Sequence, residues 1–181
     1  MHYDERTLLI RAGSAAAGSG GQRPRLLNRV TADQAGWQHL NFEVRRFEKG
    51  ERWAADTGEA EAALVVLGGQ CSVTSSRGAW ARVGRRPNVF SGMPYALYLP
   101  RRTTFEVTAL GDGLETAYGW VATDEDHPAR LVTPADSEIE IRGGHSATRQ
   151  INSIIAPGFD CHRLVVCEVY TPGGGVPALV A

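Results

Sequence analysis

The chain has 181 residues and a formal net charge of −1, with 43% hydrophobic and 22% charged residues. This composition is typical of a soluble globular protein, and the length allows one substantial core, or one domain and part of another. The near-neutral charge gives no general attraction to nucleic acid or to an anionic membrane, and no apolar run approaches the roughly 20 residues that span a bilayer. We therefore expect neither nucleic acid nor a membrane as a partner.

The N-terminus and the cysteines indicate a reducing compartment. Residues Met1–Arg6 are too polar and acidic for a signal peptide. Cys71, Cys161 and Cys167 are odd in number and show no C-x-x-C spacing. Without a secretory signal such cysteines are expected to be free thiols, so we predict a cytoplasmic protein.

The first predicted strand, Thr7–Arg11, is followed by a stretch rich in glycine, serine and alanine that predicts a flexible loop. Thr31–Gly36 predicts a turn, or a single helical turn capped by Thr31. Apolar and polar residues then alternate over residues 37–47, which predicts a strand with one apolar face. The residues on that face are Leu40, Phe42 and Val44.

Further short strands follow at roughly 8–12 residue spacing, separated by turns that contain glycine or proline. Their ranges are 62–67, 71–74, 79–83, 96–99, 104–108, 115–121, 137–142 and 149–155. The sequence has no convincing long amphipathic helix. This pattern predicts an all-β sandwich or barrel.

The last predicted strand, Arg163–Tyr170, is mostly apolar and is followed by a glycine-rich stretch and four apolar residues. It looks like the first strand of a new β unit with nothing to pair with. Unpaired backbone groups are costly to bury, so we expect an unfinished unit here.

Two stretches fit the spacing of a cupin, a small β-barrel whose metal-binding motifs contain spaced glycines, histidines and a glutamate. The residues at the motif positions are Gly50, Asp56, Gly58 and Glu61 in the first stretch, and Pro100, Arg102 and Phe105 in the second. Phe105 stands where the second motif has a histidine, and it offers no donor atom to a metal. We therefore expect a metal-free barrel.

Six sequence blocks follow one another in a fixed order, at residues 35–44, 88–100, 130–134, 138–143, 148–152 and 168–174. Together they resemble the 5-deoxy-glucuronate isomerase family, and the resemblance runs from about residue 26 to Gly174. The resemblance implies a double-cupin enzyme of inositol catabolism that converts 5-deoxy-glucuronate to 2-deoxy-5-keto-gluconate. It also implies a divalent metal held by the second barrel, in a region that would follow Gly174.

The expected fold is thus an all-β cupin-type (jelly-roll) barrel with an incomplete start of a second barrel. The expected divisions are an N-terminal strand and flexible loop (1–24), a metal-free barrel (25–125), an inter-barrel segment (126–162) and a truncated second barrel (163–181). Because the family's metal ligands have no counterpart here, we expect no metal in this chain and no activity from it alone. Its catalytic residues are unknown.

Arg142, His145 and Arg149 are the candidate substrate-binding residues, because two cations and a histidine in a glycine-rich loop could meet a sugar acid. The arginine pairs at 85–86 and 101–102 are interpreted as solvated surface. Glu43, Glu59 and Glu61 are interpreted as core or surface groups without a catalytic role.

Two alternatives to an enzyme remain open. The chain could be a non-catalytic cupin that binds a sugar acid or a partner protein, with Arg163–Tyr170 as a pairing edge for a homo-oligomer. The C-terminal segment could instead fold back onto the first barrel. Pairing of residues 163–170 with residues 149–155 or with the early strands would favour that arrangement.

Overall fold

The computed structural model describes residues 24–144 and 147–172. These residues form thirteen strands and one short helix, α2 (Ala32–Ala35). The strands of the first half are β1 (Arg25–Val30), β2 (Asn41–Phe47), β3 (Arg52–Asp56), β4 (Ala60–Gly68), β5 (Cys71–Ser75) and β6 (Gly78–Val83). Those of the second half are β7 (Tyr95–Leu99), β8 (Thr104–Ala109), β9 (Leu114–Ala122), β10 (Arg130–Val132), β11 (Glu138–Arg142), β12 (Arg149–Ile155) and β13 (Val166–Tyr170).

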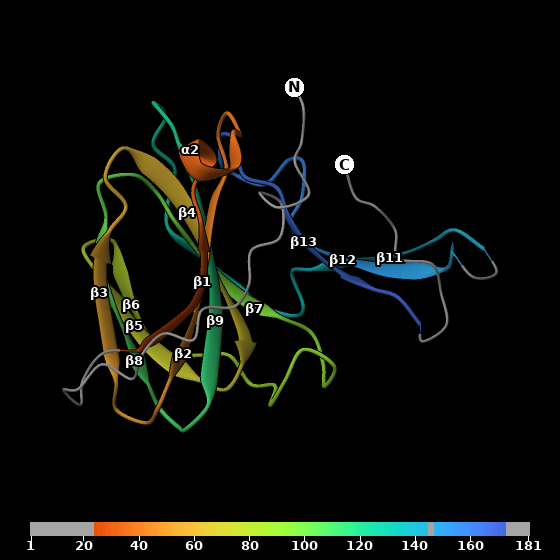
Figure 1. The fold of residues 1–181 in the computed structure, drawn as a ribbon, viewed down its shortest axis with the longest axis horizontal. Coiled ribbons are helices and arrows are strands. Elements are labelled where there is room, and N and C mark those ends of the chain that lie inside the picture. Colours follow the sequence, from red (N-terminus) through yellow and green to blue (C-terminus); the bar gives the residue numbers. More distant parts are fainter. Residues whose placement is uncertain (1–23, 145–146, 173–181) are drawn as a thin grey trace.

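Two antiparallel sheets face each other and form a barrel-like body (Figure 1). The larger sheet has the order β1-β2-β9-β4-β7-β10, and the smaller has the order β3-β8-β5-β6. Their facing side chains make the first core, which includes Phe47, Leu64, Val66, Val73, Leu97, Leu99, Phe105, Val107 and Leu114. The predicted all-β class is confirmed.

Strand β4 is apolar along nearly its whole length because both of its faces are covered. Leu64 and Val66 point into the barrel, whereas Ala63 and Val65 lie on the outer face of the larger sheet. A strand buried on both sides reads as a continuous apolar run rather than an alternating one. Glu61 interrupts that run and is nevertheless fully buried.

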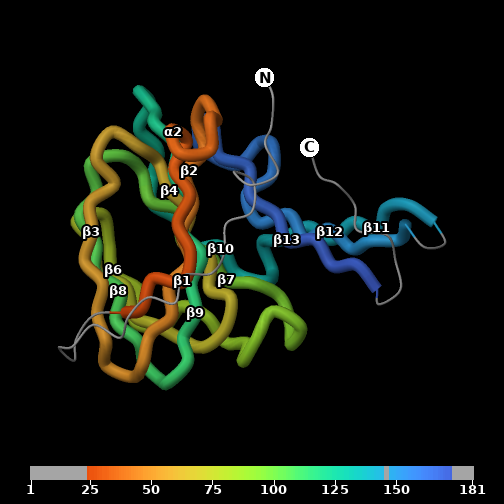
Figure 2. Tube along the Cα trace, in the orientation of Figure 1, coloured from red at the N-terminus to blue at the C-terminus, as the bar shows by residue number. Residues whose placement is uncertain are grey.

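A separate three-stranded sheet, β11-β12-β13, extends away from the barrel, as Figure 2 shows. At its base it contributes to a second core on the outer face of the larger sheet, where Ile154, Ile155 and Leu164 pack with Tyr98 and Val121. This second core lies on the side of β4 that faces away from the barrel interior. It joins the last described strands to the barrel.

The expectation that Arg163–Tyr170 has no strand to pair with is wrong. Strand β13 pairs antiparallel with β12 over Gln150–Ile155, in the register that sets Ile151 opposite Val169. It begins at Val166 rather than at Arg163, because the preceding amides bind a side chain of β4. This is the pairing that the fold-back alternative requires, although the three strands form a sheet of their own.

The predicted strand exists over Asn41–Phe47, with Phe42 and Glu43 on opposite faces as predicted, but its polar face points into the barrel. Glu43 is buried and Arg45 mostly buried, both on the barrel side, whereas Phe42 packs against the outer core. Mutual pairing and an aromatic neighbour make the two charges tolerable inside. Leu40 lies before the strand and is exposed.

Three elements lay outside the predicted strands: β1, β3 and β10. Strand β10 pairs with β7 in the larger sheet, so barrel strands continue beyond residue 125. The division into domains stays a prediction.

The predicted cap is confirmed, since Thr31 Oγ1 accepts from Gln34 N at 3.3 Å and Gln34 Oε1 accepts from Thr31 N at 3.1 Å. The predicted strand at Thr7–Arg11 lies outside the described residues.

No helix in the described ranges has the length and apolar character needed to cross a membrane.

Candidate functional site

The barrel interior around Phe105 is filled by aromatic rings. Trp53 of β3 makes edge contacts with Phe105 of β8 and Tyr118 of β9, each with ring centroids 5.2 Å apart. Trp120 lies 5.3 Å from Tyr118 on the same strand face. These are inward-facing positions of three strands, so the rings converge and occupy the place that the cupin resemblance gives to a metal ligand.

A paired carboxylate and two arginines flank these rings. Arg45 Nε donates to Glu43 Oε1 at 2.7 Å, and the Arg45 guanidinium lies 4.5 Å from the centroid of Trp53. Arg29 lies 5.8 Å from the Trp120 ring and 3.9 Å from Glu43. Burial, together with the nearby negative charge of Glu43, raises the pKa of Tyr118, so this phenol stays neutral.

The cupin motif positions do not converge on a common point. Asp56 accepts from the Gly58 amide at 2.6 Å within a turn. Glu61 lies on the outer face of the larger sheet, beside Tyr98, whereas Phe105 points into the barrel from the smaller sheet. No three histidine, cysteine, aspartate or glutamate residues in the described ranges are grouped so that they could hold a metal ion. The donors present in this barrel do not fit a divalent cation.

Glu61 is fully buried, and hydrogen bonds surround its carboxylate. Its carboxylate accepts from Tyr98 Oη at 2.8 Å, from His162 N at 3.0 Å, from Leu164 N at 2.9 Å and from the amide of Arg163. Burial alone would raise its pKa, but these four hydrogen bonds hold the pKa below the usual value for glutamate. The carboxylate therefore anchors the turn that leads into β13.

Arg86 forms a second anchor at the other end of β13. Its guanidinium binds the Glu168 carboxylate through both terminal nitrogens and donates to Tyr170 Oη at 3.1 Å. The same group donates to Val66 O at 3.2 Å and to Gly92 O at 3.1 Å. Arg86 is 3% exposed, so its interpretation as solvated surface is wrong. Glu168 and Tyr170, which lie more than 80 residues later in the sequence, bind the guanidinium in place of solvent water.

Two histidines that are distant in sequence share a carboxylate. Glu125 lies 3.4 Å from His127 Nε2 and 3.4 Å from His162 Nε2, through its two oxygens. His127 Nδ1 also contacts Asp160 at 2.6 Å, and this contact raises the pKa of His127 although burial opposes it. Sequence reasoning missed this cluster, because neither histidine has a neighbour at metal-ligand spacing.

Of the candidate substrate-binding residues, the structure places Arg142 and Arg149 directly opposite each other in β11 and β12. Arg142 Nε donates to Glu140 Oε2 at 2.6 Å, and Arg149 donates to the Ala147 carbonyl at 3.4 Å. His145 lies outside the described residues. The two arginines stay candidates as predicted.

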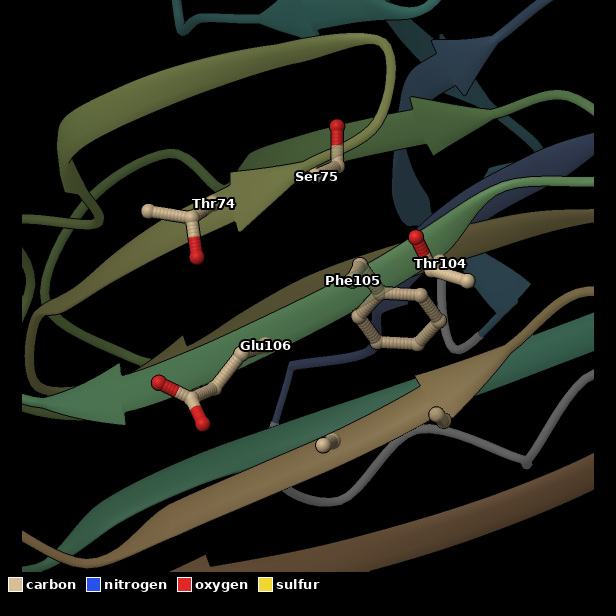
Figure 3. A pocket seen from close by; sticks show the side chains of 7 residues that line it. Thr74, Ser75, Thr104, Phe105 and Glu106 are labelled. Carbon is tan, nitrogen blue, oxygen red and sulfur yellow. The ribbon is translucent and has the colours of Figure 1, made fainter.

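Two hollows of the described surface differ in their lining. A depression of about 580 Å³ at the smaller sheet is lined by Thr74, Ser75, Thr104, Phe105 and Glu106 among others (Figure 3). Glu106 is the ionisable group of that lining, and it pairs with Arg52 at 3.5 Å. A groove of about 410 Å³ between the larger sheet and β13 is lined mainly by apolar side chains.

A family model described as the KduI/IolB family matches residues 14–177. The chain belongs to this family. It is 36% identical over 147 residues to the 5-deoxy-glucuronate isomerase of Geobacillus thermodenitrificans (strain NG80-2), covering 81% of this chain and 53% of that protein. It is 34% identical to the 5-deoxy-glucuronate isomerase of Geobacillus kaustophilus (strain HTA426), with the same coverage of both chains.

Among solved structures, the crystal structure of an IolB-like protein from Salmonella typhimurium LT2 matches with a TM-score of 0.80 at 29% identity. The match covers 87% of this chain and 59% of that one. The chain thus spans about half the length of the curated relatives that it matches.

Replacing Glu61 with glutamine tests the first anchor. The amide keeps the shape but offers one acceptor oxygen to four donors, so we expect a loss of about 3 kcal/mol in the free energy of unfolding, measured by urea denaturation at pH 7. Glu59→Gln, at an exposed carboxylate that pairs with Arg102, is the matched control and should change stability far less.

The pH dependence of the same variant gives an independent readout. The pKa of Glu61 is lower in the folded than in the unfolded state, so its contribution is present above the unfolded pKa and is lost as the pH falls through the folded pKa. The difference in stability between wild type and Glu61→Gln should therefore shrink in acid. A difference that is constant with pH would contradict this role of the carboxylate.

Arg86→Ala tests the second anchor. The change leaves the partly buried Glu168 carboxylate without its cation, and we expect it to lower the free energy of unfolding by about 3 kcal/mol. Arg85→Ala removes the exposed neighbour and serves as the control. Equal effects of the two substitutions in the same urea titration would show that the Arg86 contacts are not used in solution.

Proposed function

We propose that this chain carries the first barrel, and the strands that follow it, of a 5-deoxy-glucuronate isomerase acting in the breakdown of inositol in the cytoplasm. The observation that carries the proposal is the match to the Geobacillus thermodenitrificans isomerase, which runs through 81% of this chain. The three free cysteines agree with a reducing compartment, and burial raises the pKa of Cys71 to about 12, which keeps that thiol unreactive.

The reaction converts the aldehyde sugar acid 5-deoxy-glucuronate to the ketone 2-deoxy-5-keto-gluconate. It requires a base that moves a proton between adjacent carbons and a group that stabilises the enediolate oxygen. A divalent metal would supply that stabilisation as a Lewis acid. The described donors of this barrel are not grouped to hold such an ion, and we propose that the metal belongs to a second barrel, in the part of the curated relatives' length that this chain does not cover.

In this proposal the chain's own residues are structural. The rings of Trp53, Phe105 and Tyr118 fill the barrel interior, and Glu61 and Arg86 fix the β11-β12-β13 sheet against the barrel. The sheet is then held in one position, on which a second barrel can be built. The chain alone is expected to be inactive.

A second candidate is a non-catalytic module that binds a sugar acid. The pairing of Arg142 with Arg149 across β11 and β12 favours it, because two neighbouring guanidinium groups suit a carboxylate ligand. The two proposals differ in whether this chain by itself binds the sugar acid.

The test is incubation of the purified chain with 5-deoxy-glucuronate and added zinc or manganese, with product followed by chromatography. The Geobacillus thermodenitrificans isomerase is the positive control. We expect conversion no faster than in buffer, because the described residues supply no set of metal ligands. Turnover that is abolished by a chelator would overturn the assignment of the metal to the second barrel.

Calorimetry with the same sugar acid separates the two candidates. Saturable binding that weakens in Arg149→Ala would support the sugar-acid module. No heat of binding would leave the chain as the structural half of the isomerase.

A further inference from the structure

Strand β11 forms one edge of the three-stranded sheet. It pairs with β12 over its five residues, and within residues 24–144 and 147–172 no strand pairs with its other side. An open edge presents a row of backbone donors and acceptors to any strand that can match it. Figure 1 shows the sheet projecting away from the barrel, where a second molecule could reach this edge.

The side chains of this edge are unusual for a surface strand. Ile139 and Ile141 are 56% and 65% exposed, although isoleucine is among the residues most often buried. They occupy one face of the strand, and Glu138, Glu140 and Arg142 occupy the other. A partner strand could therefore pack against the isoleucines on one face and form ion pairs with the charged side chains on the other.

We propose that β11 pairs antiparallel with β11 of a second copy of this chain, about a two-fold axis through Glu140. This register sets Glu138 opposite the partner's Arg142 and Ile139 opposite the partner's Ile141. Symmetry repeats each contact, so one interface contains two ion pairs and two isoleucine pairs. The two three-stranded sheets become one continuous six-stranded sheet.

The charges of the strand favour this register. Glu138 takes part in no salt bridge within the described ranges. Arg142 contacts Glu140 at 2.6 Å but faces Arg149 across the sheet. A second carboxylate on its free side relieves that repulsion. The Glu140 pair on the axis is a like-charge contact, and each copy's own Arg142 compensates it.

Neighbouring registers are poorer. A shift of two residues toward the start of the strand sets Glu138 against the partner's Glu140 twice, and like charges in that position are destabilising. A shift in the other direction keeps two ion pairs, between Glu140 and the partner's Arg142, but leaves a single isoleucine pair, Ile141 with the partner's Ile141, because Ile139 then lies opposite the partner's Gly143. The other edge of the sheet, β13, has Glu168 as its charged residue, so self-pairing centred there would oppose two carboxylates.

The test uses charge reversal and sedimentation velocity over a range of concentrations. Wild type should form a reversible dimer. Glu138→Arg and Arg142→Glu each turn two attractive cross-strand pairs into repulsive ones, and each should raise the dissociation constant about tenfold or more. Arg52→Glu, on the edge strand β3 of the smaller sheet, is the matched control and should leave the dimer unchanged.

Mixing the two single variants, and testing the double variant, distinguishes loss of the interface from unfolding of the variants. An equimolar mixture of the two single variants should form heterodimers, because each introduced charge then faces its opposite. The double variant E138R/R142E should dimerise like wild type. A wild type that stays monomeric overturns the proposal. So does a dimer that is indifferent to either reversal, which would point instead to β13, or a mixture and double variant that both stay monomeric.

Discussion

A buried carboxylate without a cationic partner fixes how the two parts of this structure meet. Glu61 lies in β4, one of the two central strands of the larger sheet, and its hydrogen-bond donors are a phenol and the amides of one turn. A charge in that place is tolerable only while those donors remain. If the turn at residues 162–164 moved away, the charge would remain in an apolar environment without these hydrogen bonds.

This constraint explains where the last described strand begins. The amides that bind Glu61 are unavailable to a β ladder, and β13 starts at Val166, just after them. Arg86 then holds the strand through Glu168 and Tyr170, and the apolar core at Ile155 and Leu164 lies between the two anchors. The Glu61 carboxylate and the Arg86 guanidinium thus hold the three-stranded sheet in one position on the barrel. The aromatic rings of the barrel interior take no part in this attachment.

The strands of this fold could be predicted from period-two alternation and turn residues, and the family from its ordered blocks. The anchors could not. Glu61 gives a partial signal, because a lone carboxylate within an apolar run must have donors, but the donors lie about 100 residues later in the chain. Arg85 and Arg86 are identical in type, and the contacts that distinguish Arg86 include a carboxylate 82 residues away in the sequence. The inward polar face of β2 has a different origin, because Glu43 and Arg45 are neighbours on one strand and satisfy each other inside the barrel.

Amide hydrogen exchange at His162, Arg163 and Leu164, measured by NMR on the wild-type chain, tests the central claim most directly. If the Glu61 carboxylate holds these amides, they should exchange as slowly as the β4 amides of Leu64 and Val66, through global unfolding. Exchange as fast as that of the exposed turn residue Gly158 would show that the turn opens independently, and that the sheet is not fixed to the barrel by this group.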